Sequence, residues 1–151
     1  MRDHATMIDR PDVFRHRLRV RYSEIDVQGI VYNAHYLTFF DIGVHEFLRS
    51  LPYDYTAIGK QTGQDFNMAK GLVNYRRPLR LDEDFMVEVS ISRVGRSSLT
   101  YDLGIRVGDE DEPRATGEIV SVHADQSSNR STPLPDGLLD LLAARGFVRS
   151  G

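Results

Sequence analysis

The sequence predicts an α+β domain in which a curved antiparallel sheet of about five strands wraps around one long central helix. Three observations lead to this prediction. Apolar and charged residues alternate over 13–22, a broad apolar stripe with helical spacing follows over 34–51, and four more alternating segments lie between 67 and 125. A helix this apolar must be covered on most sides, and the concave face of the following sheet can supply that cover.

The composition is typical of one globular domain without a strong charge. The chain has 151 residues, 40% of them hydrophobic and 27% charged, with a formal net charge of -3. We expect residues 1–12 to be a flexible lead, 13–146 the folded domain and 147–151 a tail. The absence of cysteine excludes disulfides, thiolate metal sites and a cysteine nucleophile.

Charge and hydropathy also exclude several classes of partner. The weak negative charge gives no general attraction to nucleic acid. No apolar run approaches the roughly 20 residues of a membrane span, and the polar first residues lack the apolar core of a secretory signal. We therefore expect a cytoplasmic protein without nucleic-acid or membrane partners.

The first strand is expected over 13–22, because its side chains alternate with a period of two. One face would carry Phe14, His16, Leu18, Val20 and Tyr22, and the other face Arg15, Arg17, Arg19 and Arg21. Carrying the parity forward places Glu24 and Asp26 on the apolar side. A carboxylate in that position costs free energy unless it is hydrogen-bonded or functional.

The helix is expected to begin near Ala34, with Asn33 as its N-cap, and to end before Pro52. Gly43 in the middle of this helix indicates the close approach of another backbone, since glycine costs about 1 kcal/mol there relative to alanine. The apolar stripe consists of Tyr36, Phe40, Val44 and Phe47, widened by Leu37, Phe39, Ile42 and Leu48.

The remaining elements follow from alternation and turn signals. Residues 53–64 are expected to form a loop or a short helical turn. Four strands are predicted at 67–77, 85–93, 98–107 and 114–125, with hairpin connections at 94–97 and 108–113. A short amphipathic helix over 138–145, closed by Gly146, completes the domain.

The segment between the first strand and the long helix contains the residues best suited to catalysis. Two carboxylates, Glu24 and Asp26, precede a turn at Gly29, and the helix begins a few residues later. The first turn of a helix has backbone N–H groups without intrahelical partners, and these can stabilise a developing oxyanion. An acid beside such a site is the minimal equipment for acyl transfer or hydrolysis.

Three motifs in order make the chain resemble a known family. The first consists of Glu24, Asp26, Gly29, Ile30-Val31, Asn33 and Tyr36; the second runs from Tyr75 through Pro78-Leu79 to Asp82-Glu83-Asp84; the third is Gly95 to Ser98. Over about residues 14–125 the chain resembles hotdog-fold acyl-CoA thioesterases of the 4-hydroxybenzoyl-CoA thioesterase family. The resemblance implies a single hotdog domain, an acyl-CoA substrate, no cofactor, and a homodimer or homotetramer with the site at the dimer interface.

The resemblance also implies roles for particular residues. Asp26 would attack the thioester carbonyl or activate a water, although an aspartate here could simply cap a turn. The backbone N–H of Asn33 would receive the thioester oxygen. Glu24 could tune Asp26, and the interpretation we favour is a structural hydrogen-bond acceptor. The expected substrate-binding set is Glu24, Gly29, Val31, Tyr32, Tyr36, Ser97, Ser98, Arg76 and Arg96.

Several alternatives remain open from the sequence. The arginines near strand ends could bind coenzyme A phosphates, or an acidic acyl carrier protein, or only solvent. A non-catalytic acyl-CoA-binding module is a further alternative. A hydratase is disfavoured because Val31 stands where the hydratase motif has histidine, and Asp41 is the reserve candidate for the catalytic base. No His-x-x-x-His or His-x-x-Glu-His spacing occurs, so we expect no metal site.

Overall fold

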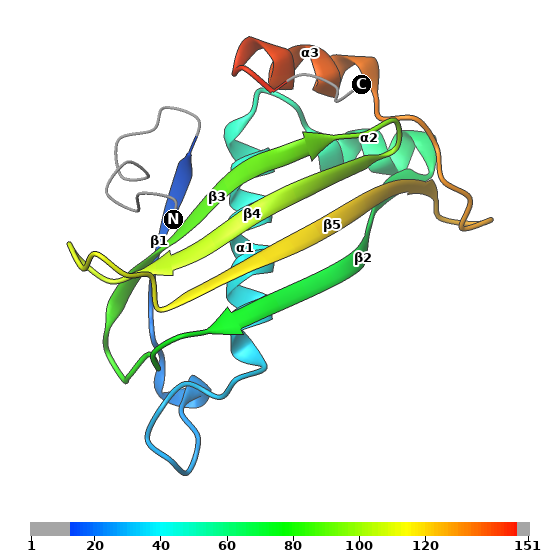
Figure 1. Cartoon of the computed structure of the whole chain (residues 1–151). Helices are drawn as coiled ribbons and strands as arrows, with labels where there is room; N and C mark the ends of the chain where they lie inside the picture. Colours follow the sequence, from blue (N-terminus) through cyan, green and yellow to red (C-terminus); the bar gives the residue numbers. More distant parts are fainter. Residues whose placement is uncertain (1–12, 148–151) are drawn as a thin grey trace.

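The structure, a computed structural model, describes residues 13–147. Within these residues five antiparallel strands form one sheet with the order β1-β3-β4-β5-β2 (Figure 1). The strands are β1 (Phe14–Arg19), β2 (Gln64–Tyr75), β3 (Asp84–Val94), β4 (Ser98–Arg106) and β5 (Ala115–Asp125). The predicted lead 1–12 and residues 148–151 of the predicted tail 147–151 lie outside the described residues. Phe147, the first residue of that tail, instead packs against the core, with its ring centroid 6.5 Å from that of Phe47.

Helix α1 (His35–Ser50) lies against one face of the sheet, as the apolar stripe predicted (Figure 1). Its buried face packs on side chains of β3, β4 and β5, and Phe40 and Phe47 are almost fully buried. Gly43 lies against β3, where an added Cβ would come within 3.1 Å of the Val89 side chain and closer still to Val87. The close neighbours of this glycine are therefore side chains and not the backbone that the sequence suggested.

The first strand is shorter than predicted. It ends at Arg19, and a 3₁₀ turn, η2 (Tyr22–Glu24), follows it. The Glu24 carboxylate accepts the backbone N–H of Arg21 at 2.7 Å, and this hydrogen bond stabilises the turn relative to a continued strand. Tyr22 is consequently 84% exposed, so its predicted inward orientation is wrong. Glu24 is buried as predicted, but because the 3₁₀ turn directs its side chain inward and not because the strand continues.

The N-cap prediction for Asn33 is also wrong. The helix begins at His35, and the cap position is Ala34, whose backbone is already helical (φ -66, ψ -22) and which makes no side-chain cap hydrogen bond. Asn33 is instead held through its carbonyl, which accepts the Tyr75 hydroxyl at 2.7 Å. A contact from the distant strand β2 thus positions Asn33, while no described side chain caps the start of α1.

Two short helices lie near the end of the sheet that is remote from residues 20–34 (Figure 1). Helix α2 (Tyr55–Thr62) occupies the region predicted as a loop or helical turn, and the Asp54 side chain caps it by accepting the Ala57 N–H at 3.1 Å. Helix α3 (Asp136–Ala144) is amphipathic as predicted and buries Leu138 and Leu142 completely.

Candidate active site

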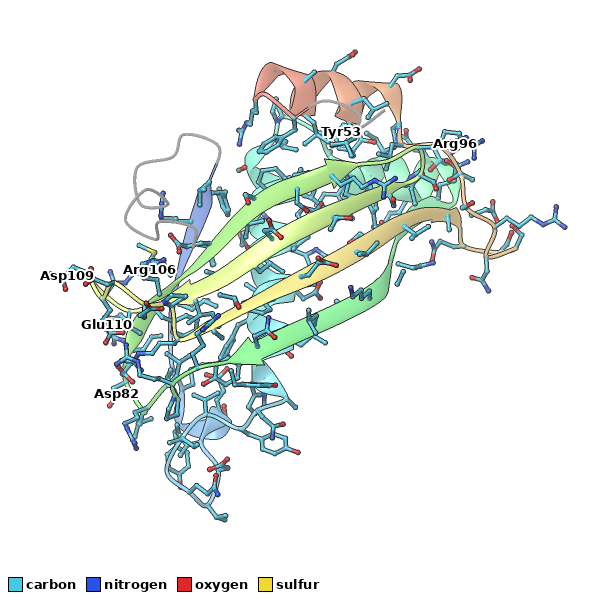
Figure 2. All side chains as sticks on the ribbon, viewed as in Figure 1. Tyr53, Asp82, Arg96, Arg106, Asp109 and Glu110 are labelled. Atoms are coloured by element: carbon cyan, nitrogen blue, oxygen red, sulfur yellow. The ribbon has the colours of Figure 1, made fainter. Side chains whose placement is uncertain are left out.

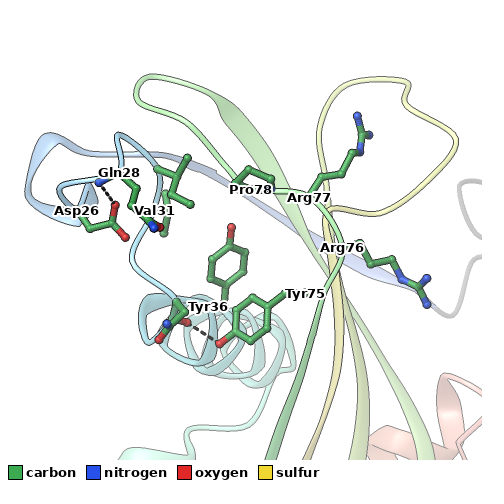
Figure 3. A pocket seen from close by; sticks show the side chains of 10 residues that line it. Asp26, Gln28, Val31, Tyr36, Tyr75, Arg76, Arg77 and Pro78 are labelled. Carbon is green, nitrogen blue, oxygen red and sulfur yellow. Dashed lines mark hydrogen bonds between the residues drawn. The ribbon is translucent and has the colours of Figure 1, made fainter.

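A cavity of about 240 Å³ opens beside the start of α1 (Figure 3). Two chain segments form it: the loop that precedes the helix and the segment that leaves β2. The lining residues are Asp26, Gln28, Ile30, Val31, Asn33, Tyr36, Tyr75, Arg76, Arg77 and Pro78. Five residues of the sequence-predicted site, Asp26, Val31, Asn33, Tyr36 and Arg76, are therefore brought together at one cavity.

Asp26 sits at the start of a tight turn in the loop. Its Oδ1 accepts the backbone N–H of Gln28 at 2.8 Å, and its own N–H donates to the Ile30 carbonyl at 2.9 Å. Gly29 has φ +76, a conformation that favours glycine, and its N–H donates to the Asp26 carbonyl at 3.0 Å. Among residues 13–147 the other carboxylate oxygen has no hydrogen-bond partner, so half of the carboxylate can act on a ligand.

The helix start leaves backbone donors available. Near the helix start, three backbone N–H groups are paired with backbone carbonyls: Val31 with Leu79, Tyr32 with Glu24, and His35 with Tyr32. In the described part of the chain the N–H groups of Asn33 and Ala34 make no hydrogen bond. The N-terminus of a helix has a partial positive charge, so these two groups are suited to an oxyanion.

Two tyrosines fasten the helix start to the segment that leaves β2. The Tyr75 hydroxyl donates to the Asn33 carbonyl at 2.7 Å, and the Leu79 N–H donates to the Tyr36 hydroxyl at 3.0 Å. Their rings meet edge to face at 5.1 Å. Burial raises the pKa of the Tyr36 hydroxyl, which therefore stays protonated. We did not predict Tyr75 as a site residue, although it opens the second sequence motif.

Glu24 does not line the cavity. Its side chain is bound by the N–H of Arg21 at 2.7 Å and by the Arg21 guanidinium at 3.1 Å, while its carbonyl accepts the Tyr32 N–H. It stabilises both ends of the loop that carries Asp26. Tyr32 is 49% exposed outside the cavity, with its ring against His35.

The predicted residues Arg96, Ser97 and Ser98 lie far from Asp26 within one chain. They form the β3–β4 hairpin at the opposite end of the sheet, where Figure 2 labels Arg96. The hairpin is closed by the Gly95 N–H on the Ser98 carbonyl at 2.8 Å, and the Ser97 carbonyl accepts the His123 N–H at 2.7 Å. A single chain thus leaves these residues outside the cavity.

The reserve candidate Asp41 also lies outside the cavity lining. It is half exposed on α1, with its Oδ2 3.7 Å from Nε2 of His45, whose Nδ1 lies 2.8 Å from the Tyr55 hydroxyl. Across residues 13–147 no cluster of three His, Asp or Glu side chains is arranged to hold a metal ion. None of the described helices is long and apolar enough to cross a membrane.

Comparison with known proteins identifies the family. The family model of the thioesterase-like superfamily matches residues 20–142. A putative esterase of Aquifex aeolicus is 31% identical over 88 residues, which make up 58% of this chain and 68% of the relative. The acyl-CoA thioester hydrolase YbgC of Escherichia coli is 28% identical over 127 residues, 84% of this chain and 93% of the relative.

Solved structures agree on the fold. The 1,4-dihydroxy-2-naphthoyl-CoA thioesterase Slr0204 of Synechocystis superposes with a TM-score of 0.80 at 15% identity, covering 87% of this chain and 96% of that one. The family match spans most of the domain, from the residue after β1 to Leu142 within α3. This chain therefore belongs to the thioesterase-like superfamily and has the hotdog fold that its motifs predicted.

Proposed function

We propose that this protein hydrolyses acyl-CoA thioesters to a free acid and coenzyme A. The observation that supports this most strongly is that one cavity is lined both by Asp26, whose carboxylate keeps one oxygen without a partner, and by Asn33, whose backbone N–H before α1 is unpaired among the described residues. The name of the Escherichia coli relative, an acyl-CoA thioester hydrolase, supports the same substrate class.

The proposed chemistry divides between the carboxylate and the helix start. As a nucleophile, Asp26 attacks the thioester carbonyl carbon, the coenzyme A thiolate leaves, and water hydrolyses the resulting anhydride. As a general base, Asp26 instead takes a proton from the attacking water. In both routes the carbonyl oxygen becomes an oxyanion, and the N–H groups of Asn33 and Ala34 stabilise it in the transition state.

Arg76 is the proposed contact for the coenzyme A phosphates. It lines the cavity, is exposed, and makes no ion pair with the described residues. Arg77, its neighbour, is bound to Glu110 at 2.8 Å and is less available. A free guanidinium at the mouth of the cavity can form charge-assisted hydrogen bonds with a phosphate.

We further propose that a homodimer completes the site. Strand β2 is an edge strand of 12 residues, and it exposes Met68, Leu72 and Tyr75 at 43%, 43% and 54%. A two-fold axis beside β2 pairs the two copies antiparallel, which brings the Gln64 end of the partner strand beside Tyr75. The Arg96–Ser98 hairpin lies at that Gln64 end, since Gln64 pairs with Asp125 and Ser98 with Val122 of β5.

The carrier is tested by direct comparison of rates. Purified protein should release free thiol from an acyl-CoA faster than from the same acyl group on acyl carrier protein. A higher kcat/KM on the carrier protein would instead support the acyl carrier protein alternative. Stoichiometric binding of acyl-CoA without thiol release would show a non-catalytic binding module and refute the proposed function.

Hydrolysis is expected to survive exhaustive treatment with EDTA. The proposed route needs only a carboxylate, water and backbone N–H groups, so removal of divalent ions should leave kcat unchanged. The measurement is thiol release before and after chelation and gel filtration. Loss of activity that a divalent ion restores would contradict the proposed mechanism.

Short, medium or aromatic acyl groups are expected to give higher kcat/KM than palmitoyl-CoA. The cavity of about 240 Å³ is walled by Tyr36 and Tyr75, and each buried methylene adds about 0.8 kcal/mol only until the cavity ends. Phe39, Phe40 and Phe47 belong to the core and not to this wall, and Phe40 packs on Gly117 of β5. The measurement is a series from acetyl- to palmitoyl-CoA with a benzoyl or phenylacetyl substrate, and a monotonic rise to palmitoyl would contradict the expectation.

A further inference from the structure

The guanidinium of Arg114, directly before β5, is saturated with hydrogen bonds. Its Nε and Nη2 bind the Glu110 carboxylate at 2.8 and 2.9 Å, and its Nη2 and Nη1 bind Glu83 at 3.0 and 3.2 Å. The remaining Nη1 donor binds the Pro78 carbonyl at 2.7 Å. All five N–H donors of the group are thus used, although Arg114 does not line the cavity.

Arg114 holds the segment that walls the cavity by backbone contacts as well. Its carbonyl accepts the N–H groups of Arg76 and Arg77 at 3.0 and 3.1 Å, immediately before the bonded Pro78. Three consecutive residues of the exit from β2 are therefore bound to one arginine. Figure 2 labels Glu110 and Asp82 at this end of the sheet, opposite Arg96.

The next residue transmits this restraint to the catalytic loop. The Leu79 carbonyl accepts the Val31 N–H at 2.9 Å, and the Leu79 N–H donates to the Tyr36 hydroxyl at 3.0 Å. Leu79 and Val31 are 0% and 2% exposed, so water does not replace these bonds. The path runs from Arg114 through Pro78 and Leu79 to both sides of Asn33.

The anchors of Arg114 are fixed in turn. Glu83 also accepts the Arg80 N–H at 2.8 Å, and its carbonyl accepts the Val20 N–H at 2.9 Å, at the exit of β1. The Arg114 guanidinium holds the pKa of Glu110 below its usual range, so that carboxylate stays ionised near neutrality. A lysine would keep the charge but could not span two carboxylates and a carbonyl with one fork.

We infer that Arg114 is a positioning residue that, acting through Pro78 and Leu79, holds the loop 26–33 and the start of α1 in register for catalysis. The kinetic part of this inference rests on the proposed function, whereas the structural part does not. A misplacement of about 1 Å at reacting groups can lower a rate by about 100-fold. Arg76 keeps its backbone bond to the Arg114 carbonyl in a variant, so substrate binding should change less than turnover.

Amide hydrogen exchange tests the positioning without reference to activity. In Arg114→Lys the Val31 and Leu79 amides should exchange about tenfold faster or more, because their bonds open locally. The control is the Leu134 amide, bonded to the Arg96 carbonyl at the far end of the sheet, whose exchange should not change. Unchanged protection of Val31 and Leu79 would overturn the inference.

Kinetics then test whether the positioning matters for turnover. Arg114→Lys should lower kcat by about 10- to 100-fold while KM changes by less than about threefold. The control is Leu142→Ala, a fully buried site in α3, which should lower Tm yet keep kcat when both variants are assayed equally far below their Tm. Equal losses of kcat in the two variants would mean a general effect of stability and overturn the kinetic part.

A double-mutant cycle identifies the path. Tyr36→Phe removes the acceptor of the Leu79 N–H, so in the double variant with Arg114→Lys the loss of kcat should be smaller than the product of the single losses. Losses that multiply would show that Arg114 does not act through the bond between Leu79 and Tyr36. If the wild-type protein releases no thiol, the proposed function fails, and the exchange experiment alone still decides the positioning role.

Discussion

Asp26→Asn is expected to lower kcat for thioester hydrolysis by about 10²- to 10⁴-fold. Asparagine is nearly isosteric with aspartate but can act neither as a base nor as an anionic nucleophile. The amide oxygen can still accept the Gln28 N–H, which Oδ1 now accepts at 2.8 Å, so the turn and Tm should be preserved. Steady-state thiol release and a melting curve measure the two effects separately.

The matched control is Asp41→Asn, which changes the same functional group on α1, more than one helical turn beyond the cavity-lining Tyr36. Asp41 is half exposed on α1 and does not line the cavity, so its substitution should leave kcat near the wild-type value. If Asp26→Asn retained more than about a tenth of the activity and Asp41→Asn lost it, the catalytic base would be Asp41.

The double substitution M68D/L72D is expected to convert a dimer into an inactive monomer. Both side chains are exposed on the edge strand β2, one on each face, so the pair would bring like charges together across the proposed two-fold axis. Light scattering should give a molecular mass of twice 17.2 kDa for the wild type and of 17.2 kDa for the variant. Activity should fall by about 100-fold or more if the partner completes the site.

Met86→Asp is the control for this experiment. Met86 is 38% exposed on β3, away from the β2 edge, and the same charge there should leave the dimer and its activity intact. Full activity of a wild-type protein that scatters as a monomer at micromolar concentration would contradict the shared site. A monomeric M68D/L72D with wild-type kcat/KM would do so equally.

The regular elements were predictable because their patterns follow from backbone geometry. Alternation over 85–93 and 98–107 predicted β3 and β4 to within one residue at each end, since a strand turns alternate side chains toward α1. The stripe from Tyr36 to Phe47 predicted α1 for the same kind of reason, and these side chains are buried. Irregular segments were predicted less well. Strand β1 stops early because the Glu24 carboxylate accepts the Arg21 N–H, and Asn33 is not the cap because α1 begins one residue later than predicted, with Ala34 at the cap position.

By itself, the sequence determined the α+β architecture, the family and the cavity residues Asp26, Val31, Asn33, Tyr36 and Arg76. Most of these lie close together in one loop and helix start, where local spacing is enough to place them. Only the tertiary structure brought the exit of β2 and Arg114 to that loop and left Arg96–Ser98 at the other end of the sheet. The reason is physical: an arginine or a tyrosine side chain can donate a hydrogen bond to almost any carbonyl or carboxylate in a protein. The packing of strands that are distant in the sequence decides which of these acceptors lies within reach.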